Sequence, residues 1–125
     1  MTAIQQRDLQ ILQLSRLQIP EIKMQPYLEN SKPNHWLSTI ILDKNSKVKP
    51  LDIIEKLDKE NIETRPIWKP MHMQPVFANY DFIKFVEDKP VSEDIFERGV
   101  CLPSDTKMTE EEQSKVIESI KECFE

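Results

Sequence analysis

The segment RPIWKPMHMQPVF, residues 65–77, gathers the side chains best suited to hold a ligand. Arg65 can grip a carboxylate or a phosphate with two hydrogen bonds, and Trp68 offers a flat face to a ring. His72 and Gln74 can hydrogen-bond polar atoms. The prolines of the segment reduce the entropy lost on binding. These four side chains are therefore candidate binding residues. The alternative is a capped loop whose aromatic side chains complete the core.

A self-sufficient catalytic centre is not indicated by the sequence. His35 and His72 lie far apart and belong to no H-E-x-x-H pattern. Two histidines and two cysteines do not supply three or four metal ligands at a recognisable spacing. The single glycine, Gly99, excludes a Walker-type loop, a G-x-G-x-x-G fingerprint and a G-x-S-x-G elbow. We therefore expect no metal site and assign no catalytic residue.

Length and composition favour one soluble domain. A chain of 125 residues can bury roughly two-thirds of its unfolded surface. Its 17 basic and 22 acidic residues give a net charge of -5, which argues against binding nucleic acid through phosphates. Two cysteines without a C-x-x-C spacing indicate reduced thiols. We find no signal-peptide core and no apolar run of membrane-spanning length. We expect a cytoplasmic protein with no membrane partner.

Three strands are expected to position the candidate residues. The β-branched and apolar run at 36–42 predicts the strongest strand. A second strand over 62–68 must lie at an edge or end early, because Pro66 cannot donate to a ladder. A third, at 100–102, is closed by Pro103. The proline-rich stretch before the first strand is a loop that can hold a short extended piece at 22–24.

The helices of this α+β domain are expected on one face of the small sheet. Pro50 suits the first turn of a helix. Ser92 caps a further helix that Gly99 ends in the left-handed conformation. Thr109 and Glu112 form the capping box of a C-terminal helix. The expected helices cover residues 1–19, 50–60, 92–98 and the segment from 109, with a short helical turn within 79–85.

Three stretches of this sequence resemble one enzyme family. They are NHWLSTIILD at 34–43, RPIWKPMHMQPVF at 65–77, and SEDIFERGVCLPSDTKMTEEEQSKVIESI at 92–120. The chain resembles the C-terminal small domain of pyridoxal-phosphate-dependent nucleotide-sugar aminotransferases of the DegT/StrS type. The resemblance implies the small-domain fold of a fold-type-I aminotransferase over residues 20–125. It also implies that residues 1–19 are the remnant of the helix that links two domains.

The resemblance implies part of an enzyme that transfers an amino group to a keto sugar in polysaccharide or glycan biosynthesis. In this family the cofactor lysine, the acid beside the pyridine nitrogen and the phosphate-binding loop lie in a large domain. No segment here is similar to those. Pyridoxal phosphate is thus implied for the intact enzyme, and none is expected for this chain alone, which would be inactive.

In such enzymes the loop that matches residues 65–74 faces the cofactor cleft. The resemblance therefore implies contacts from Arg65, Trp68, His72 and Gln74 to a nucleotide-sugar substrate. A large domain or a second copy of the chain is the implied partner. Two alternatives stay open: a stand-alone protein-interaction module, and a nucleotide-sugar binder without catalysis. Arg65 can also serve an ion pair within the domain.

Overall fold

The computed structural model describes residues 18–34, 36–85 and 87–125. The helix expected over 1–19 lies outside these residues, apart from its last two positions, where the chain is not helical. Among the described helices, none is long and apolar enough to cross a membrane.

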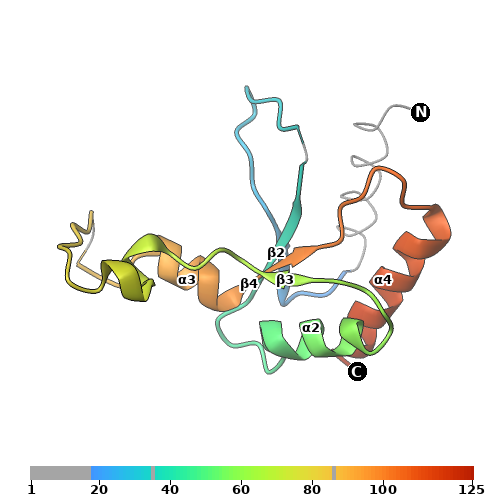
Figure 1. Cartoon of the computed structure of the whole chain (residues 1–125). Coiled ribbons are helices and arrows are strands. Elements are labelled where there is room, and N and C mark those ends of the chain that lie inside the picture. Colours follow the sequence, from blue (N-terminus) through green and yellow to red (C-terminus); the bar gives the residue numbers. More distant parts are fainter. Residues whose placement is uncertain (1–17, 35, 86) are drawn as a thin grey trace.

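One antiparallel sheet forms the centre of the domain, and Figure 1 shows it between the helices. Its strand order is β1-β2-β4-β3. The expected α+β class is confirmed, but the expected count of three strands was wrong, because residues 22–24 form a fourth. Ile22 pairs with Leu42 in that strand. Three residues are too few to show an alternating pattern in sequence. The strands are β1 (Ile22–Met24), β2 (Ser38–Leu42), β3 (Arg65–Pro66) and β4 (Gly99–Leu102).

The strand that carries the candidate loop is short and lies at the edge. β3 contains two residues, and Arg65 lies opposite Cys101 in β4. Pro66 has no N–H to donate, so the ladder ends there. The chain then leaves the sheet towards Trp68. The early end expected for this strand is confirmed.

Two helices, α2 (Pro50–Asp58) and α4 (Glu110–Glu122), cover one face of the sheet. Alternate residues of β2 and β4 point towards them, as strand geometry requires. The capping box at the start of α4 is confirmed: Glu112 N–H donates to Thr109, and Thr109 N–H donates to Glu112. The buried cluster consists of Ile40, Leu42, Ile53, Leu57, Val100, Leu102, Val116 and Ile120.

The third helix, α3 (Val91–Arg98), leads directly into β4. Two details expected here were wrong. Pro90 rather than Ser92 occupies the N-cap, so Ser92 lies within the first turn. Gly99 is extended, with φ -98° and ψ 153°, and not left-handed. A glycine is required at this position because there is no room for a side chain. A Cβ there would lie 2.4 Å from Cγ1 of Ile67 and 2.6 Å from the carbonyl oxygen of Ile95.

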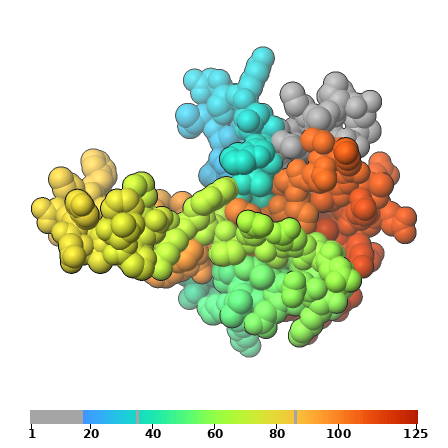
Figure 2. Space-filling model, in the orientation of Figure 1, coloured from blue at the N-terminus to red at the C-terminus, as the bar shows by residue number. Residues whose placement is uncertain are grey.

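Between β3 and α3 the chain forms an extended arm, residues 70–85. It lies apart from the body of the domain in Figure 1, and Figure 2 shows it as the projecting yellow lobe. The helical turn expected within 79–85 was wrong. Two 3-10 turns occur earlier instead, η1 (Met71–Met73) and η2 (Pro75–Phe77). Proline suits the start of each turn because its φ is already fixed near helical values.

Candidate functional site

Two tryptophans meet on the surface beside the sheet. Trp36 precedes β2 by two residues, and Trp68 follows β3 by two residues. Their ring centroids are 6.3 Å apart, with an angle of 37° between the planes. The two residues are 64% and 63% exposed. Aromatic faces that are held near each other and open to solvent can accept a planar or sugar ring.

A broad groove of about 1240 Å³ lies beside the tryptophan pair. The chain around β3, the loop after β4 and the first half of α4 line it. Four of its lining side chains are basic: Arg65, Lys69, Lys107 and Lys115. Four are acidic: Glu60, Glu63, Asp105 and Glu112. The groove thus combines aromatic surface with several charged groups that could hold polar parts of a ligand.

Arg65 lines this groove and is paired with a neighbour. Its Nε and Nη2 atoms donate to Oε1 of Glu63 at 2.8 and 2.6 Å. Both side chains are highly exposed. Such a surface ion pair contributes little net energy. The guanidinium can therefore exchange Glu63 for an anionic ligand, and it also makes the ion pair within the domain that the sequence left open.

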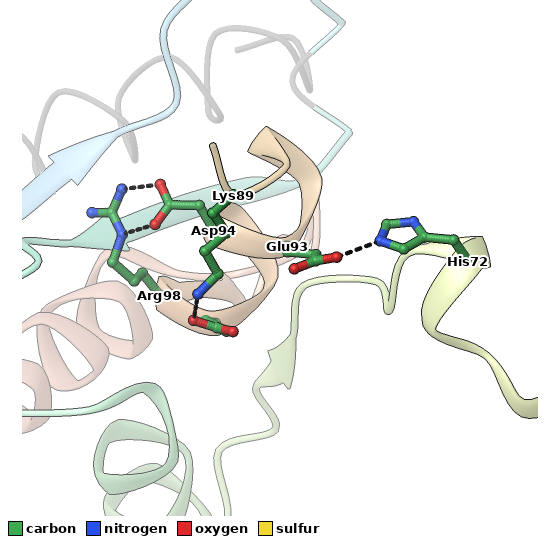
Figure 3. Close-up of polar contacts among 6 residues, drawn as sticks. His72, Lys89, Glu93, Asp94 and Arg98 are labelled. Carbon is green, nitrogen blue, oxygen red and sulfur yellow. Dashed lines mark hydrogen bonds and ion pairs between the residues drawn. The ribbon is translucent and has the colours of Figure 1, made fainter. Parts of the chain in front are cut away.

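His72 lies in the arm rather than in the tryptophan groove. Its Nε2 is 2.6 Å from Oε1 of Glu93 on α3 (Figure 3). Its ring stacks on Phe82, with centroids 3.7 Å apart and planes inclined by 11°. The side chain is 17% exposed. The contact with Glu93 joins the arm to α3, the stacking on Phe82 lies within the arm, and Nδ1 is the ring nitrogen not engaged by Glu93.

Gln74 stabilises the loop through a hydrogen bond to the loop's own backbone. Its Nε2 donates to the carbonyl oxygen of Lys69 at 3.2 Å. The structure thus brings Arg65 and Trp68 to one groove and places His72 and Gln74 in the arm. Sequence reasoning missed Trp36 and Glu93. The proximity of Trp36 to Trp68 is set by tertiary structure, and no local pattern links Glu93 with His72, 21 residues away.

The N-termini of α2, α3 and α4, the α-helices in the described part of the chain, offer no fitting place for the phosphate of pyridoxal phosphate. Helix N-termini bind phosphate through free N–H groups and a positive dipole end. Here the first turns of α2, α3 and α4 each contain acidic residues, which repel a phosphate. The acidic residues are Asp52, Glu93, Asp94, Glu110, Glu111 and Glu112.

Lys56, whose amine pairs with two carboxylates, does not fit the cofactor either. Hydrogen bonds from Lys56 to Glu122 and Glu60 raise the pKa of the Lys56 amine, whereas an imine-forming lysine must lose its proton. Burial raises the pKa of the free thiols of Cys101 and Cys123. Within residues 18–34, 36–85 and 87–125, no group of three His, Cys, Asp or Glu side chains could hold a metal ion. Neither the N-termini of α2, α3 and α4 nor Lys56 therefore fits pyridoxal phosphate.

Helix α3, which supplies Glu93, is fixed to the sheet by Arg98. The guanidinium donates to both carboxylate oxygens of Asp94, at 2.9 and 2.6 Å, and also to the carbonyl oxygen of Leu42. Figure 3 shows the paired groups on the helix. The hydrogen bonds from Arg98 lower the pKa of the Asp94 carboxyl below its ordinary value of 3.8. The folded state therefore favours the ionised carboxylate.

Replacing Asp94 with asparagine is expected to lower stability by up to about 1 kcal/mol at pH 7, because the partly exposed ion pair is lost. A carboxyl with a lowered folded-state pKa stabilises the fold above its unfolded pKa and loses that effect as pH falls through the folded pKa. The difference in the free energy of unfolding between wild type and Asp94→Asn should thus shrink below about pH 4. Urea unfolding across pH 2.5–7 measures it, with the exposed Asp58→Asn as control. A pH-independent difference would contradict this assignment.

Comparison with known proteins gives one consistent family. The sequence pattern of the DegT/DnrJ/EryC1/StrS aminotransferase family matches residues 2–121. "Putative pyridoxal phosphate-dependent aminotransferase EpsN" of Bacillus subtilis is 43% identical over 103 residues, which cover 82% of this chain and 26% of that protein. GDP-perosamine synthase of Vibrio cholerae is 28% identical over 116 residues, which cover 91% and 31%.

Solved structures show the same fold at low sequence identity. The aminotransferase TlmJ from Streptoalloteichus hindustanus matches with a TM-score of 0.77 and 13% identity, over 97% of this chain and 31% of that one. Helicobacter pylori PseC, an aminotransferase involved in the biosynthesis of pseudoaminic acid, matches with a TM-score of 0.72 and 22% identity, over 97% and 32%. The chain spans about a quarter to a third of the length of these relatives.

Proposed function

This chain belongs to the DegT/DnrJ/EryC1/StrS aminotransferase family, and from that premise we propose that it is the C-terminal small domain of a nucleotide-sugar aminotransferase. In this proposal residues 20–125 form the small domain and residues 1–19 belong to the helix that joins it to a large domain. The large domain holds pyridoxal phosphate. The small domain provides one wall of the substrate cleft and does not transfer amino groups alone.

The exposed tryptophan pair is the observation that carries this proposal. A domain that folded only for its own stability would gain by burying two indole rings, since each offers a large apolar area. Instead Trp36 and Trp68 lie open beside a groove that is lined by four basic and four acidic side chains. The acidic helix N-termini, which would repel a cofactor phosphate, support a cofactor site elsewhere.

Bound pyridoxal phosphate supplies the carrier for the amino group, and this chain supplies binding and orientation. In the proposed complex, the face of Trp68 packs against a ring of the nucleotide sugar and excludes water from that side. Arg65 exchanges Glu63 for a phosphate oxygen of the substrate, with two donors in a planar fork. Gln74 keeps the loop in shape through its bond to Lys69.

Pyridoxal phosphate added to the purified chain is expected to give no absorbance band of a lysine-linked cofactor. The reason is that the first turns of α2, α3 and α4 contain acidic residues that repel the cofactor phosphate, and that no segment of the chain is similar to the family's cofactor-lysine segment. Borohydride reduction followed by mass spectrometry checks the same point. EpsN whose matching region is replaced by this chain is the positive control, because it retains the remaining three-quarters of that protein. A stoichiometric band that disappears with one lysine substitution in the isolated chain would contradict the proposal.

A further inference from the structure

A pocket of about 400 Å³ lies on the arm, apart from the tryptophan groove. Its lining residues fall within residues 70–82, together with Ser92 at the start of α3. None of them lines the groove beside Trp36 and Trp68. Volumes of roughly 300–1000 Å³ are typical of sites that take small molecules. The arm thus carries a candidate binding site to which the proposed function gives no role.

Three aromatic rings line this pocket, those of Phe77, Tyr80 and Phe82. Phe77 and Tyr80 meet edge to face with their centroids 6.0 Å apart. Phe82 is stacked on the imidazole of His72 at 3.7 Å. The rings are therefore held in place by contacts within the arm. The face of an aromatic ring carries partial negative charge and attracts a cation, so several rings around one pocket favour an organic cation.

The charged groups at the pocket favour the same kind of ligand. Asp81 lines it, and its carboxylate makes no hydrogen bond or ion pair within residues 18–34, 36–85 and 87–125. The neighbouring amine of Lys84 donates to the carbonyl oxygen of Glu87 instead. The pair of His72 and Glu93 (Figure 3) is neutral when the imidazole is protonated and negative when it is not. The charge at the pocket is therefore negative in either state of His72.

The polar groups at the pocket indicate what else the cation should carry. The lining residues Tyr80 and Ser92 have hydroxyls, and His72 has Nδ1, the ring nitrogen that Glu93 does not engage. These groups can both accept and donate hydrogen bonds. A primary ammonium has three N–H groups to donate, whereas a quaternary ammonium has none. The pocket therefore suits a primary ammonium on a small molecule that also has hydroxyl groups.

We propose that this pocket binds a small compound with a primary ammonium group and hydroxyl groups, with the ammonium held by the aromatic rings and the Asp81 carboxylate. The inference goes beyond the proposed function and does not depend on it, because every group that forms the site belongs to this chain. An anionic ligand is disfavoured here, since the charge at the pocket is negative. The site thus differs in ligand chemistry from the tryptophan groove, where Arg65 and three lysines are among the lining residues.

Glucosamine and glucose are matched probes for this site, because they differ only in an ammonium group that replaces one hydroxyl. Each is titrated into the isolated chain at about pH 6, where an amine of this kind is protonated. NMR signals of the Tyr80 and Phe82 rings report binding. Glucosamine is expected to give saturable shifts and to bind roughly 10-fold more tightly than glucose, which makes neither the cation–aromatic contact nor the ion pair. Equal affinities, no saturable shift, or shifts confined to Trp36 and Trp68 would each overturn the proposal.

Substitutions at the pocket provide the second measurement, after circular dichroism confirms that each variant is folded. Asp81→Asn should weaken the binding of glucosamine by roughly 5-fold and leave that of glucose unchanged, because it removes only the charge. Tyr80→Ala should weaken glucosamine binding by roughly 3-fold. Asp88→Asn removes another exposed carboxylate, one that does not line the pocket, and should change neither affinity. A folded Asp81→Asn variant that binds glucosamine as tightly as the wild type would contradict the assignment. The comparison of the two sugars on the wild type needs no substitution and stands if a variant fails to fold.

Discussion

Replacing Gly99 with alanine is expected to destabilise the domain by about 3 kcal/mol, near the upper end of the usual cost of overpacking. The added Cβ would lie 2.4 Å from Cγ1 of Ile67 and 2.6 Å from the carbonyl oxygen of Ile95. Both distances are far below van der Waals contact. Gly99 is also the point at which α3 passes into β4, so the backbone has little freedom to move away.

Alanine also has a stabilising effect at this position, but it is too small to make Gly99→Ala stabilising. Alanine reduces the entropy of the unfolded chain and stabilises by about 0.4–1 kcal/mol where its native conformation is unstrained. The φ of -98° at Gly99 is open to any residue, so this gain applies here. It remains smaller than the steric cost. Chemical unfolding of the isolated chain measures the balance.

The double variant Gly99→Ala/Ile67→Ala separates the two contacts. Removing the Ile67 side chain relieves one clash, but the Ile95 carbonyl is backbone and stays. We expect Ile67→Ala to recover part of the loss, with a coupling energy of about 1 kcal/mol between the sites. A Gly99→Ala variant as stable as the wild type would show that α3 can shift, and with it the position of Glu93.

The sequence predicted those parts of the fold that depend on local chemistry. The apolar run of β2, the proline start of α2 and the Thr109–Glu112 capping box each act within a few residues. The errors concern features decided by distant neighbours. β1 forms because Ile22–Met24 meets β2, and Gly99 is needed because Ile67 packs against it. The sequence predicted an extended piece at 22–24, but neither its pairing with β2 nor the contact between Ile67 and Gly99 can be read from the local pattern.

In the candidate site, too, the sequence predicted single residues but not the contacts between distant ones. Trp68 and Arg65 could be identified from residue type alone, because an indole can stack on a ring and a guanidinium can bind an anion with two hydrogen bonds. The structure places both side chains on one groove. Their neighbours could not be predicted. Trp36 reaches Trp68 only in the folded sheet, and Glu93 meets His72 only because α3 packs beside the arm.

Trp68→Ala in the chimera with EpsN is expected to lower kcat/KM for the nucleotide-sugar substrate about 10- to 100-fold, since stacking of a base on an aromatic side chain contributes about 1–3 kcal/mol. Trp68→Phe should retain most of the activity, because it keeps a flat ring. The unfolding free energy of the isolated chain should change by less than about 1 kcal/mol in either variant, because the indole is largely exposed.

Two comparisons make this result specific to the tryptophan face. Trp36→Ala removes the neighbouring ring, 6.3 Å away, and should lower kcat/KM less than Trp68→Ala does, because in the proposed complex Trp68 is the ring that packs against the substrate. Leu51→Ala, which truncates an exposed apolar side chain on α2 away from the tryptophan pair, should leave kcat/KM unchanged. If Trp68→Ala has no larger effect than Leu51→Ala, the open tryptophan face does not contact the substrate, and the wall of the cleft must lie elsewhere on this domain.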